Sequence, residues 1–269
     1  MSETGDVAKA VEGIVKAVPI YNDALQPAAK ELGTALATVA KTVNVALAPL
    51  RALVWGWEQI EKELLPLLID KLKHIPQDRI TTPSLPIAGP AMEGLRFAGH
   101  EPQLRELYAN LLATSMDATT AQEAHPGFVE IIRQLTPDEA RILRRFETHK
   151  VYPMLTPSGA LFGLVPRFSL LPYQAFCDHP HLGPNYLSNL ERLGIVVINW
   201  REAYMFKLDW TSLREHPDVQ AAVKSSGLPA VAHELDAFEL GAIQLTGFGQ
   251  QFCQACVFPR AAVGLSEAT

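Results

Sequence analysis

Three cysteines and two histidines come nearest to the composition and spacing of a metal site. Cys177, His179 and His181 fall within the five-residue stretch CDHPH, and two residues separate Cys253 from Cys256. Thiolate and imidazole groups at such spacings are ligands of zinc. The last two cysteines, however, fall on a predicted helix beside apolar residues, where a free thiol is typical of a small buried side chain. We therefore expect no metal and no cofactor.

Motifs of the common enzyme classes are missing from the sequence. It has no glycine-rich phosphate loop, no G-x-S-x-G elbow and no H-E-x-x-H pair. Carboxylate pairs such as Glu61 with Glu63, or Glu101 with Glu106, have no accompanying nucleophile and no metal-site spacing, so we interpret them as solvated charges. The sequence predicts a protein that is not an enzyme.

The composition is that of a folded protein without a basic surface field. Hydrophobic residues make up 48% of the 269 residues, and the formal net charge is -6. This charge does not favour nucleic acid as a partner. The start of the chain lacks the pattern of a secretory signal, and three cysteines cannot all pair, so a reducing, cytoplasmic location is expected.

An unusually uncharged stretch lies near the amino terminus, at 24–57. Its apolar and small residues recur at alternating steps of four and three, which predicts a helix that packs along its length, with a break at Pro49. The opposite face is small and only weakly polar. We expect this stretch to pack or self-associate through Leu36, Val39, Val43, Leu47 and Leu50. Trp55 and Trp57 would anchor one end of it.

Three interpretations of this stretch compete. Permanent insertion in a bilayer is disfavoured, because Lys41 and Asn44 lie mid-span and a central lysine costs about 3 kcal/mol. A central helix wrapped by the other amino-terminal helices explains both the low charge and the spacing. A conditional hairpin, sheltered in the globule and released to a membrane or to other copies, explains the small residues.

The region after this stretch predicts further helices and an extended arm. Four prolines between 76 and 90 predict a strap, and helices are expected at 90–98, 102–116 and 126–135.

From residue 136 the pattern changes to that of a mixed domain. Thr136 and Glu139 form a predicted capping box, a helix at 184–193 should end at Gly194, and IVVIN at 195–199 predicts a strand that AYMFKLD at 203–209 could pair with. A helical insertion at 211–225, a strand and a closing helix complete an order typical of a winged helix.

One basic cluster lies at the start of this mixed domain. Arg141, Arg144 and Arg145 form it, on the first predicted helix, and we interpret it as a solvated face or a binding site for an acidic partner. The helix at 185–193, which would read DNA in a winged helix, has no net charge, so nucleic acid is not expected as a partner.

Five ordered blocks of the sequence carry a family resemblance. The blocks are QPAAKELG at 26–33, VNVALAPLRALVWG at 43–56, LRELYANLLATSMD at 104–117, AHPGFVEIIRQLTPDEARIL at 124–143 and LTGFGQQFCQACV at 245–257. Together they resemble the Abi-alpha (abortive infection) family of bacteria over about residues 20 to 257. The resemblance implies a role in defence against phage and supplies no catalytic motif. In this family a proline is expected in place of Gly247.

The sequence thus predicts a mainly α-helical protein with two parts. Low-charge helices at 7–75 and a Pro-rich strap with helices at 76–135 form an amino-terminal bundle, and a winged-helix-like α+β domain with an insertion follows at 136–260. We expect a nonenzymatic antiphage effector whose amino-terminal helices self-assemble or engage the inner membrane, with a phage or host protein as a further partner. The alternative is a winged-helix regulatory or adaptor module that binds protein or nucleic acid.

Overall fold

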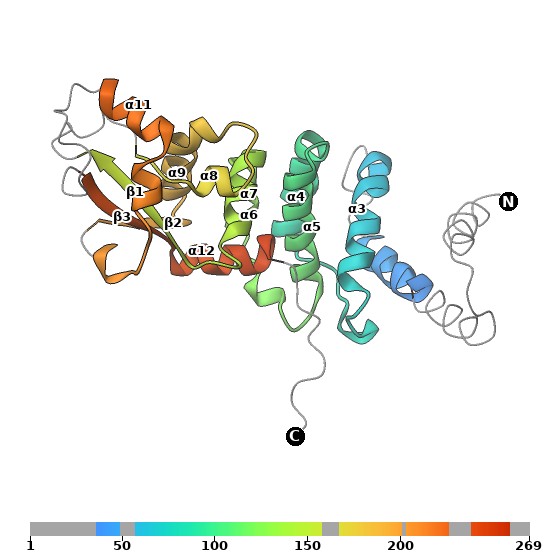
Figure 1. Ribbon diagram of the computed structural model, residues 1–269. Helices are drawn as coiled ribbons and strands as arrows, with labels where there is room; N and C mark the ends of the chain where they lie inside the picture. The colour runs from blue at the N-terminus through green and yellow to red at the C-terminus, as the bar shows by residue number, and fades with distance from the viewer. Residues whose placement is uncertain (1–35, 49–56, 158–166, 201–202, 226–237, 259–269) are drawn as a thin grey trace, which may run out of the picture.

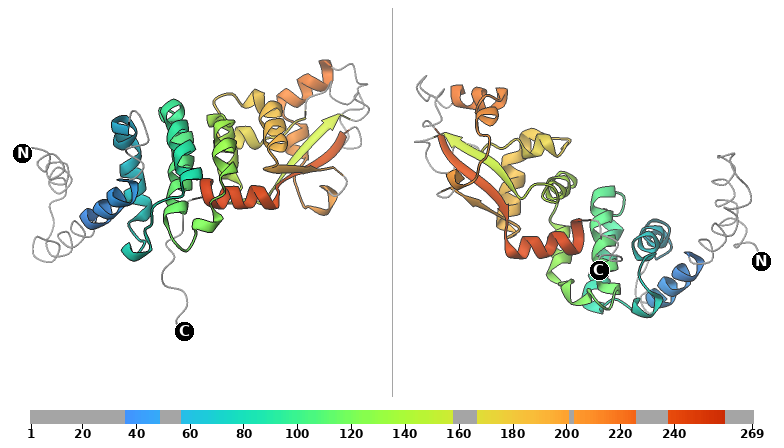
Figure 2. Two further views of the ribbon diagram at one scale, coloured as in Figure 1. Left: turned by 180° about the vertical axis from the view of Figure 1, so that it is seen from behind. Right: turned by 60° about the horizontal axis from the view of Figure 1, so that its bottom comes forward.

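The computed structural model describes residues 36–48, 57–157, 167–200, 203–225 and 238–258. They form a mainly helical protein with one three-stranded antiparallel sheet. Figure 1 shows an elongated arrangement, with the sheet at one end and the helix at 36–48 at the other. The two views of Figure 2 agree with this arrangement.

A central helix, α5 (Pro102–Met116), organises the amino-terminal half. All of its residues from 107 to 116 are buried, because other helices surround it. It packs against α3 (Trp57–Leu72), α4 (Leu85–Ala98), α6 (Gly127–Arg133) and the π-helical turn η6 (Cys253–Val257). One of the three interpretations of the sequence gave this central place to a helix at 24–57. The described part of that stretch, 36–48, instead lies at the outer end, beside α3 (Figure 1).

Two buried polar residues of α5 bind the carboxyl-terminal end of the chain. The side-chain amide of Asn110 donates a hydrogen bond of 2.8 Å to the carbonyl oxygen of Cys256, and the Thr114 hydroxyl donates one of 2.9 Å to that of Ala255. The last carbonyl groups of a helix lack partners within the helix, so these bonds satisfy acceptors that would otherwise be buried unpaired. The carboxyl-terminal turn is thereby fixed to the amino-terminal half.

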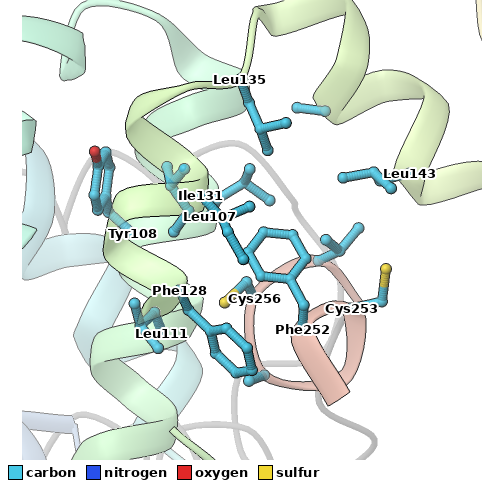
Figure 3. Packing of buried hydrophobic residues seen from close by; sticks show 14 of the residues in the cluster. Leu107, Tyr108, Leu111, Phe128, Ile131, Leu135, Leu143, Phe252, Cys253 and Cys256 are labelled. Carbon is cyan, nitrogen blue, oxygen red and sulfur yellow. The ribbon is translucent and has the colours of Figure 1, made fainter. Parts of the chain in front are cut away.

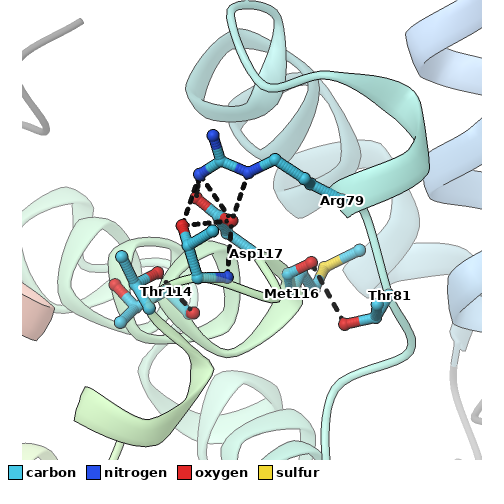
Figure 4. A network of polar contacts seen from close by, with 7 residues as sticks. Arg79, Thr81, Thr114, Met116 and Asp117 are labelled. Atoms are coloured by element: carbon cyan, nitrogen blue, oxygen red, sulfur yellow. Dashed lines mark hydrogen bonds and ion pairs between the residues drawn. The ribbon is translucent and has the colours of Figure 1, made fainter. Parts of the chain in front are cut away.

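The Pro-rich arm is fastened to the end of α5 by one buried carboxylate (Figure 4). Asp117 accepts hydrogen bonds from Arg79 at 2.9 Å and from the backbone N–H of Thr119 at 3.0 Å. Burial alone would raise the pKa of Asp117, but the Thr119 and Arg79 bonds outweigh it and lower the pKa below its ordinary value. Helix α4 then begins at Leu85, five residues earlier than expected, and Pro90 lies inside it.

The carboxyl-terminal half alternates short helices with three strands. Its elements after α6 are α7 (Pro137–Arg145), β1 (Val151–Pro157), α8 (Leu171–Gln174), η3 (Pro180–Leu182), α9 (Gly183–Arg192), β2 (Val196–Asn199), η4 (Ala203–Met205), α10 (Thr211–Arg214), α11 (Pro217–Ser225), β3 (Phe238–Leu245) and α12 (Gly247–Phe252). The predicted capping box is confirmed, with the Thr136 hydroxyl accepting from the N–H of Glu139 at 3.2 Å. Gly194 has a φ of 71° after α9, where the left-handed conformation favours glycine.

The sheet has the order β1-β3-β2, and both pairs are antiparallel. Strand β1 was not expected from the sequence. The expected pairing of 195–199 with 203–209 was wrong: β2 pairs with β3, with Ile198 opposite Ile243, and residues 203–205 form the short helix η4.

Two hydrophobic clusters stabilise the fold. The larger includes buried residues from Val39 to Val257 and therefore joins both halves of the chain. The smaller lies where the insertion α10–α11 covers the sheet, and it contains Leu155, Leu213, Val219 and Phe238. The insertion thus adds a core of its own at the sheet end of the molecule.

Candidate functional site

One side of the helix at 36–48 is buried in the core of the same chain. Val39, Val43, Ala46 and Leu47 are buried and belong to the larger cluster. Their spacing of four, three and one places them on one side of a helix. Val39, Val43 and Leu47 were predicted packing residues, and the structure brings them together within the larger cluster of the same chain.

The opposite side of this helix faces solvent and carries little charge. Ala37, Lys41, Val45 and Ala48 are exposed and share a face; we call them the outer stripe. Val45 is 67% exposed, although valine is usually buried. Sequence reasoning described this face as small and weakly polar but did not single out Val45 on it.

The remaining residues of the predicted surface have different positions. Leu36 begins the helix and is 40% exposed. Trp57 is the first residue of α3. Leu50 and Trp55 lie outside the described residues. The predicted pairing of the tryptophans as an anchor is therefore not tested.

The three predicted partner-binding arginines on α7 differ in their surroundings. Arg141 forms ion pairs with Asp138 and, at 2.7 Å, with Asp178 of the same chain. Arg144 is exposed. The Nε atom of Arg145 is buried and has no hydrogen-bond partner among the described residues. Acidic groups of the same chain thus bind one member of the predicted cluster.

Asp138 is the residue that holds the CDHPH stretch in place. Its carboxylate accepts hydrogen bonds from the backbone N–H groups of Asp178 at 2.8 Å and His179 at 3.0 Å, and from the Tyr186 hydroxyl at 2.9 Å. Burial alone would raise the pKa of Asp138, but these bonds and the Arg141 ion pair outweigh it, so the pKa is lowered. Sequence reasoning missed this role, since the bonded groups lie 40 to 48 residues away.

The cysteines of the suggested metal site have separate surroundings. Cys177 is half-buried next to Asp138, and burial together with the Asp138 charge raises its pKa to about 12. Cys253 and Cys256 lie in the core beside Phe128 and Phe252 (Figure 3), where burial raises the pKa of both thiols. Within the described ranges, no group of three or more metal-ligating side chains is found.

In the part of the chain that the structure describes, no helix is both long enough and apolar enough to span a membrane.

Comparisons with known proteins give one family and one solved structure. The structure is that of an uncharacterized protein from the hydrocarbon-degrading marine bacterium Alcanivorax borkumensis SK2, with 18% identity over 50% of this chain and 92% of that chain. Its TM-score of 0.33 does not establish a shared fold. No curated protein sequence matches the chain.

The family model, abortive infection alpha, matches residues 56–256. The expected start near residue 20 was therefore too early, and the helix at 36–48 precedes the matched region. The match includes the central helix α5, the Asp138 contacts and the three-stranded sheet. By this match over most of its length, the chain belongs to the abortive infection alpha (Abi_alpha) family.

Proposed function

We propose that this chain is an abortive-infection effector that has no catalytic step and acts by self-association through the outer stripe of the helix at 36–48. The family membership supports the antiphage role. The observation that carries the self-association is Val45, which is 67% exposed on the side away from the core, between Lys41 and Ala48 of the outer stripe. A second copy of the chain is the proposed occupant of this face.

The size of the outer stripe sets the strength of the contact. Burying the exposed part of Val45 contributes about 1 to 2 kcal/mol per copy, and Ala37 and Ala48 allow two helices to approach closely. This is too little for a permanent dimer. Self-association should therefore depend on protein concentration, as suits an effector that acts only after infection.

The sheet end supports a second part of the proposal. The order α7, β1, α8, α9, β2, β3 with strand order β1-β3-β2 supports the proposal of a winged-helix-like unit, in which α9 would correspond to the recognition helix. On α9, Asn189 donates to Glu139 at 2.8 Å and Arg192 donates to Gln134 at 3.0 Å, so intramolecular bonds engage its polar side chains. We infer a unit that binds a phage or host protein, with Arg144 and Arg145 in the contact, rather than a reader of DNA.

The test replaces Val45 with aspartate and, as the matched control, with isoleucine. Isoleucine keeps an apolar β-branched side chain, whereas aspartate places a charge in the proposed contact. Sedimentation velocity of the full chain over a range of concentrations should show association for the wild type and the Val45→Ile variant, and monomer for the Val45→Asp variant. Growth of infected bacteria that express each variant should follow the same order. Equal association of all three proteins would contradict the proposal.

Two further measurements separate the alternatives. Flotation with anionic liposomes that is lost in the Val45→Asp variant would assign the outer stripe to the inner membrane instead of a second copy. Salt-sensitive retention on heparin would favour the alternative function, an adaptor that binds nucleic acid.

A further inference from the structure

A pocket lies between the winged-helix-like unit and its insertion. Its volume is about 140 Å³. Its lining comes from the segment 167–170, α8, η3 and the start of α9 on one side, and from α10, α11 and His216 between them on the other. Pockets for drug-sized molecules have volumes of about 300 to 1,000 Å³. The space therefore fits one small group, such as the end of a side chain, and not a nucleotide-sized cofactor.

The walls of this pocket are apolar and its rim is polar. Phe168, Leu170, Leu213 and Val219 line it, and all four belong to or pack against the smaller hydrophobic cluster. This cluster fixes the walls, because Leu213 and Val219 are themselves fully buried on the insertion side. An apolar stem entering here would lose contact with water, as in most ligand sites.

Asp218 is the acidic group of the rim. Its Oδ2 accepts a hydrogen bond from the Tyr173 hydroxyl, and its side chain remains 57% exposed. The backbone N–H of Asp218 donates to Nδ1 of His216 at 3.3 Å, and the same Nδ1 lies 3.9 Å from Oδ2 of Asp218. The ring of His216 also lies 4.7 Å from that of Tyr173. The Tyr173 hydroxyl thus positions the carboxylate, and His216 holds the backbone of the residue that carries it.

The one arginine in the lining has its charge engaged elsewhere. Arg167 donates to Glu191 at 2.7 Å, and its guanidinium group lies 5.8 Å from the centre of the Trp200 ring. The lining also contains His181 and His216; with both histidines counted as neutral and Arg167 paired with Glu191, the Asp218 carboxylate is the net charge of the pocket. A cation is the complementary ligand.

From these contacts we propose that the pocket binds one organic cation, a guanidinium or alkylammonium group on a short apolar stem, with Asp218 as its counter-ion. The stem contacts Leu170, Leu213 and Val219, and the cation donates hydrogen bonds to the carboxylate at the rim. Such a group belongs either to a free small molecule or to an arginine or lysine side chain of a protein. The proposal does not depend on self-association through the outer stripe.

The test titrates the full chain with butylguanidinium and with its neutral analogue of the same shape, N-butylurea. Methyl resonances of Leu213 and Val219, observed by NMR, report binding at the pocket itself. We expect butylguanidinium to shift both resonances and to bind at least tenfold more tightly than N-butylurea, because a charged hydrogen bond is lost in the neutral compound. Equal affinity for the two compounds, or no shift at millimolar concentration, would overturn the proposal.

Two variants and a control identify the counter-ion. The Asp218→Asn variant keeps the shape and the bond from Tyr173, and it should lose the preference for the cation. The Tyr173→Phe variant keeps the ring but releases the carboxylate, and it should bind a few-fold more weakly. The control, Glu215→Gln, removes an exposed acid three residues away that does not line the pocket. An unchanged preference in Asp218→Asn would contradict the assignment.

A last comparison separates the sources of the cation. A capped arginine peptide that binds at least tenfold more tightly than butylguanidinium would assign the site to a protein side chain. Equal affinity of the two would assign it to a free small molecule.

Discussion

The hydroxyl group of Tyr186 on α9 donates a hydrogen bond of 2.9 Å to the carboxylate of Asp138 on α7. The same carboxylate accepts the backbone N–H groups of Asp178 and His179, and it pairs with Arg141. One buried charge therefore joins two helices and the loop between them. These hydrogen bonds favour the ionised form of the carboxyl group and weaken when it is protonated.

The first prediction follows from this contact and concerns acid. The folded-state pKa of Asp138 lies below 3.8, the ordinary value, so its stabilising effect is fully present above about 3.8 and is lost as the pH falls from there through the lower pKa of the folded state. The Asp138→Asn variant should lower the free energy of unfolding by about 2 kcal/mol at pH 7. Urea titrations at several pH values should show this difference shrink below about pH 4.

Asp70 provides the control for this measurement. Its pKa is also lowered, chiefly by the bond from Lys73, but the pair is exposed on the surface of α3. Exposed ion pairs contribute little to stability, so Asp70→Asn should leave the curve nearly unchanged. A difference for Asp138→Asn that stays constant from pH 7 to pH 3 would show that its charge does not stabilise the fold.

Local signals in the sequence located several elements correctly. The bounds of α5, the capping box of Thr136 and the helix stop at Gly194 were predicted, because each depends on neighbouring residues. Strand β1 was missed because Pro153 and Pro157 disfavour a strand. The structure explains their presence: β1 is an edge strand of the sheet, where proline is tolerated, and an isolated bridge from Leu155 to Phe168 is its further pairing among the described residues.

Long-range contacts account for the other differences. The spacing of Val39, Val43 and Leu47 predicts a packed face, but spacing does not tell whether the partner is the same chain or another copy. The structure places Val43 in the core of its own chain, so a charge there would disrupt folding. Val45 is therefore the residue at which self-association can be tested without removing a core contact.

The packing of α4 against α5 gives a second prediction. A Cβ atom at Gly94 would overlap the hydroxyl group of Tyr108 and the ring carbon that bears it. Gly94→Ala should destabilise the protein by about 1 to 3 kcal/mol, measured by urea unfolding. The Tyr108 hydroxyl has no hydrogen-bond partner among the described residues, so adding Tyr108→Phe should restore part of the loss.

Gly89 on the same helix is the control for this substitution. No atom lies within 4 Å of a Cβ placed there, so Gly89→Ala should stabilise the helix by about 0.5 to 1 kcal/mol. Equal changes in the free energy of unfolding at the two positions would mean that a Cβ atom at Gly94 does not overlap Tyr108.

Phe176 carries a third prediction, because its backbone and its side chain are both unusual. It has a φ of 53°, a conformation that favours glycine or asparagine, and its ring is 84% exposed. Phe176→Asn should stabilise the protein by about 0.5 to 1 kcal/mol, since little packing is lost. Phe176→Val also removes the ring but cannot adopt this backbone easily, and it should destabilise. Both variants lack the ring, so the difference between their melting temperatures reports the backbone effect. A melting temperature of Phe176→Asn below that of the wild type would show that the Phe176 ring contributes packing.

The last prediction concerns Gly247, where the family resemblance suggests proline. Gly247 is the first residue of α12, a position that suits proline because its N–H is not needed within the helix. The preceding Thr246 has φ -68° and ψ 170°, which a following proline requires, and no atom lies within 4 Å of a Cβ at Gly247. Gly247→Pro should therefore raise the free energy of unfolding by about 0.4 to 1 kcal/mol, by restricting the unfolded chain.

Gly249, two residues later, has the opposite surroundings and supplies the matched comparison. A Cβ there would overlap the carbonyl oxygen of Ile195, and its N–H donates to the Thr246 hydroxyl at 2.8 Å. Gly249→Ala should therefore destabilise the protein, because the strand β2 and the helix α12 would have to separate. Differential scanning calorimetry of both variants gives the comparison. A lower melting temperature for Gly247→Pro would mean that the first residue of α12 cannot accommodate the proline ring.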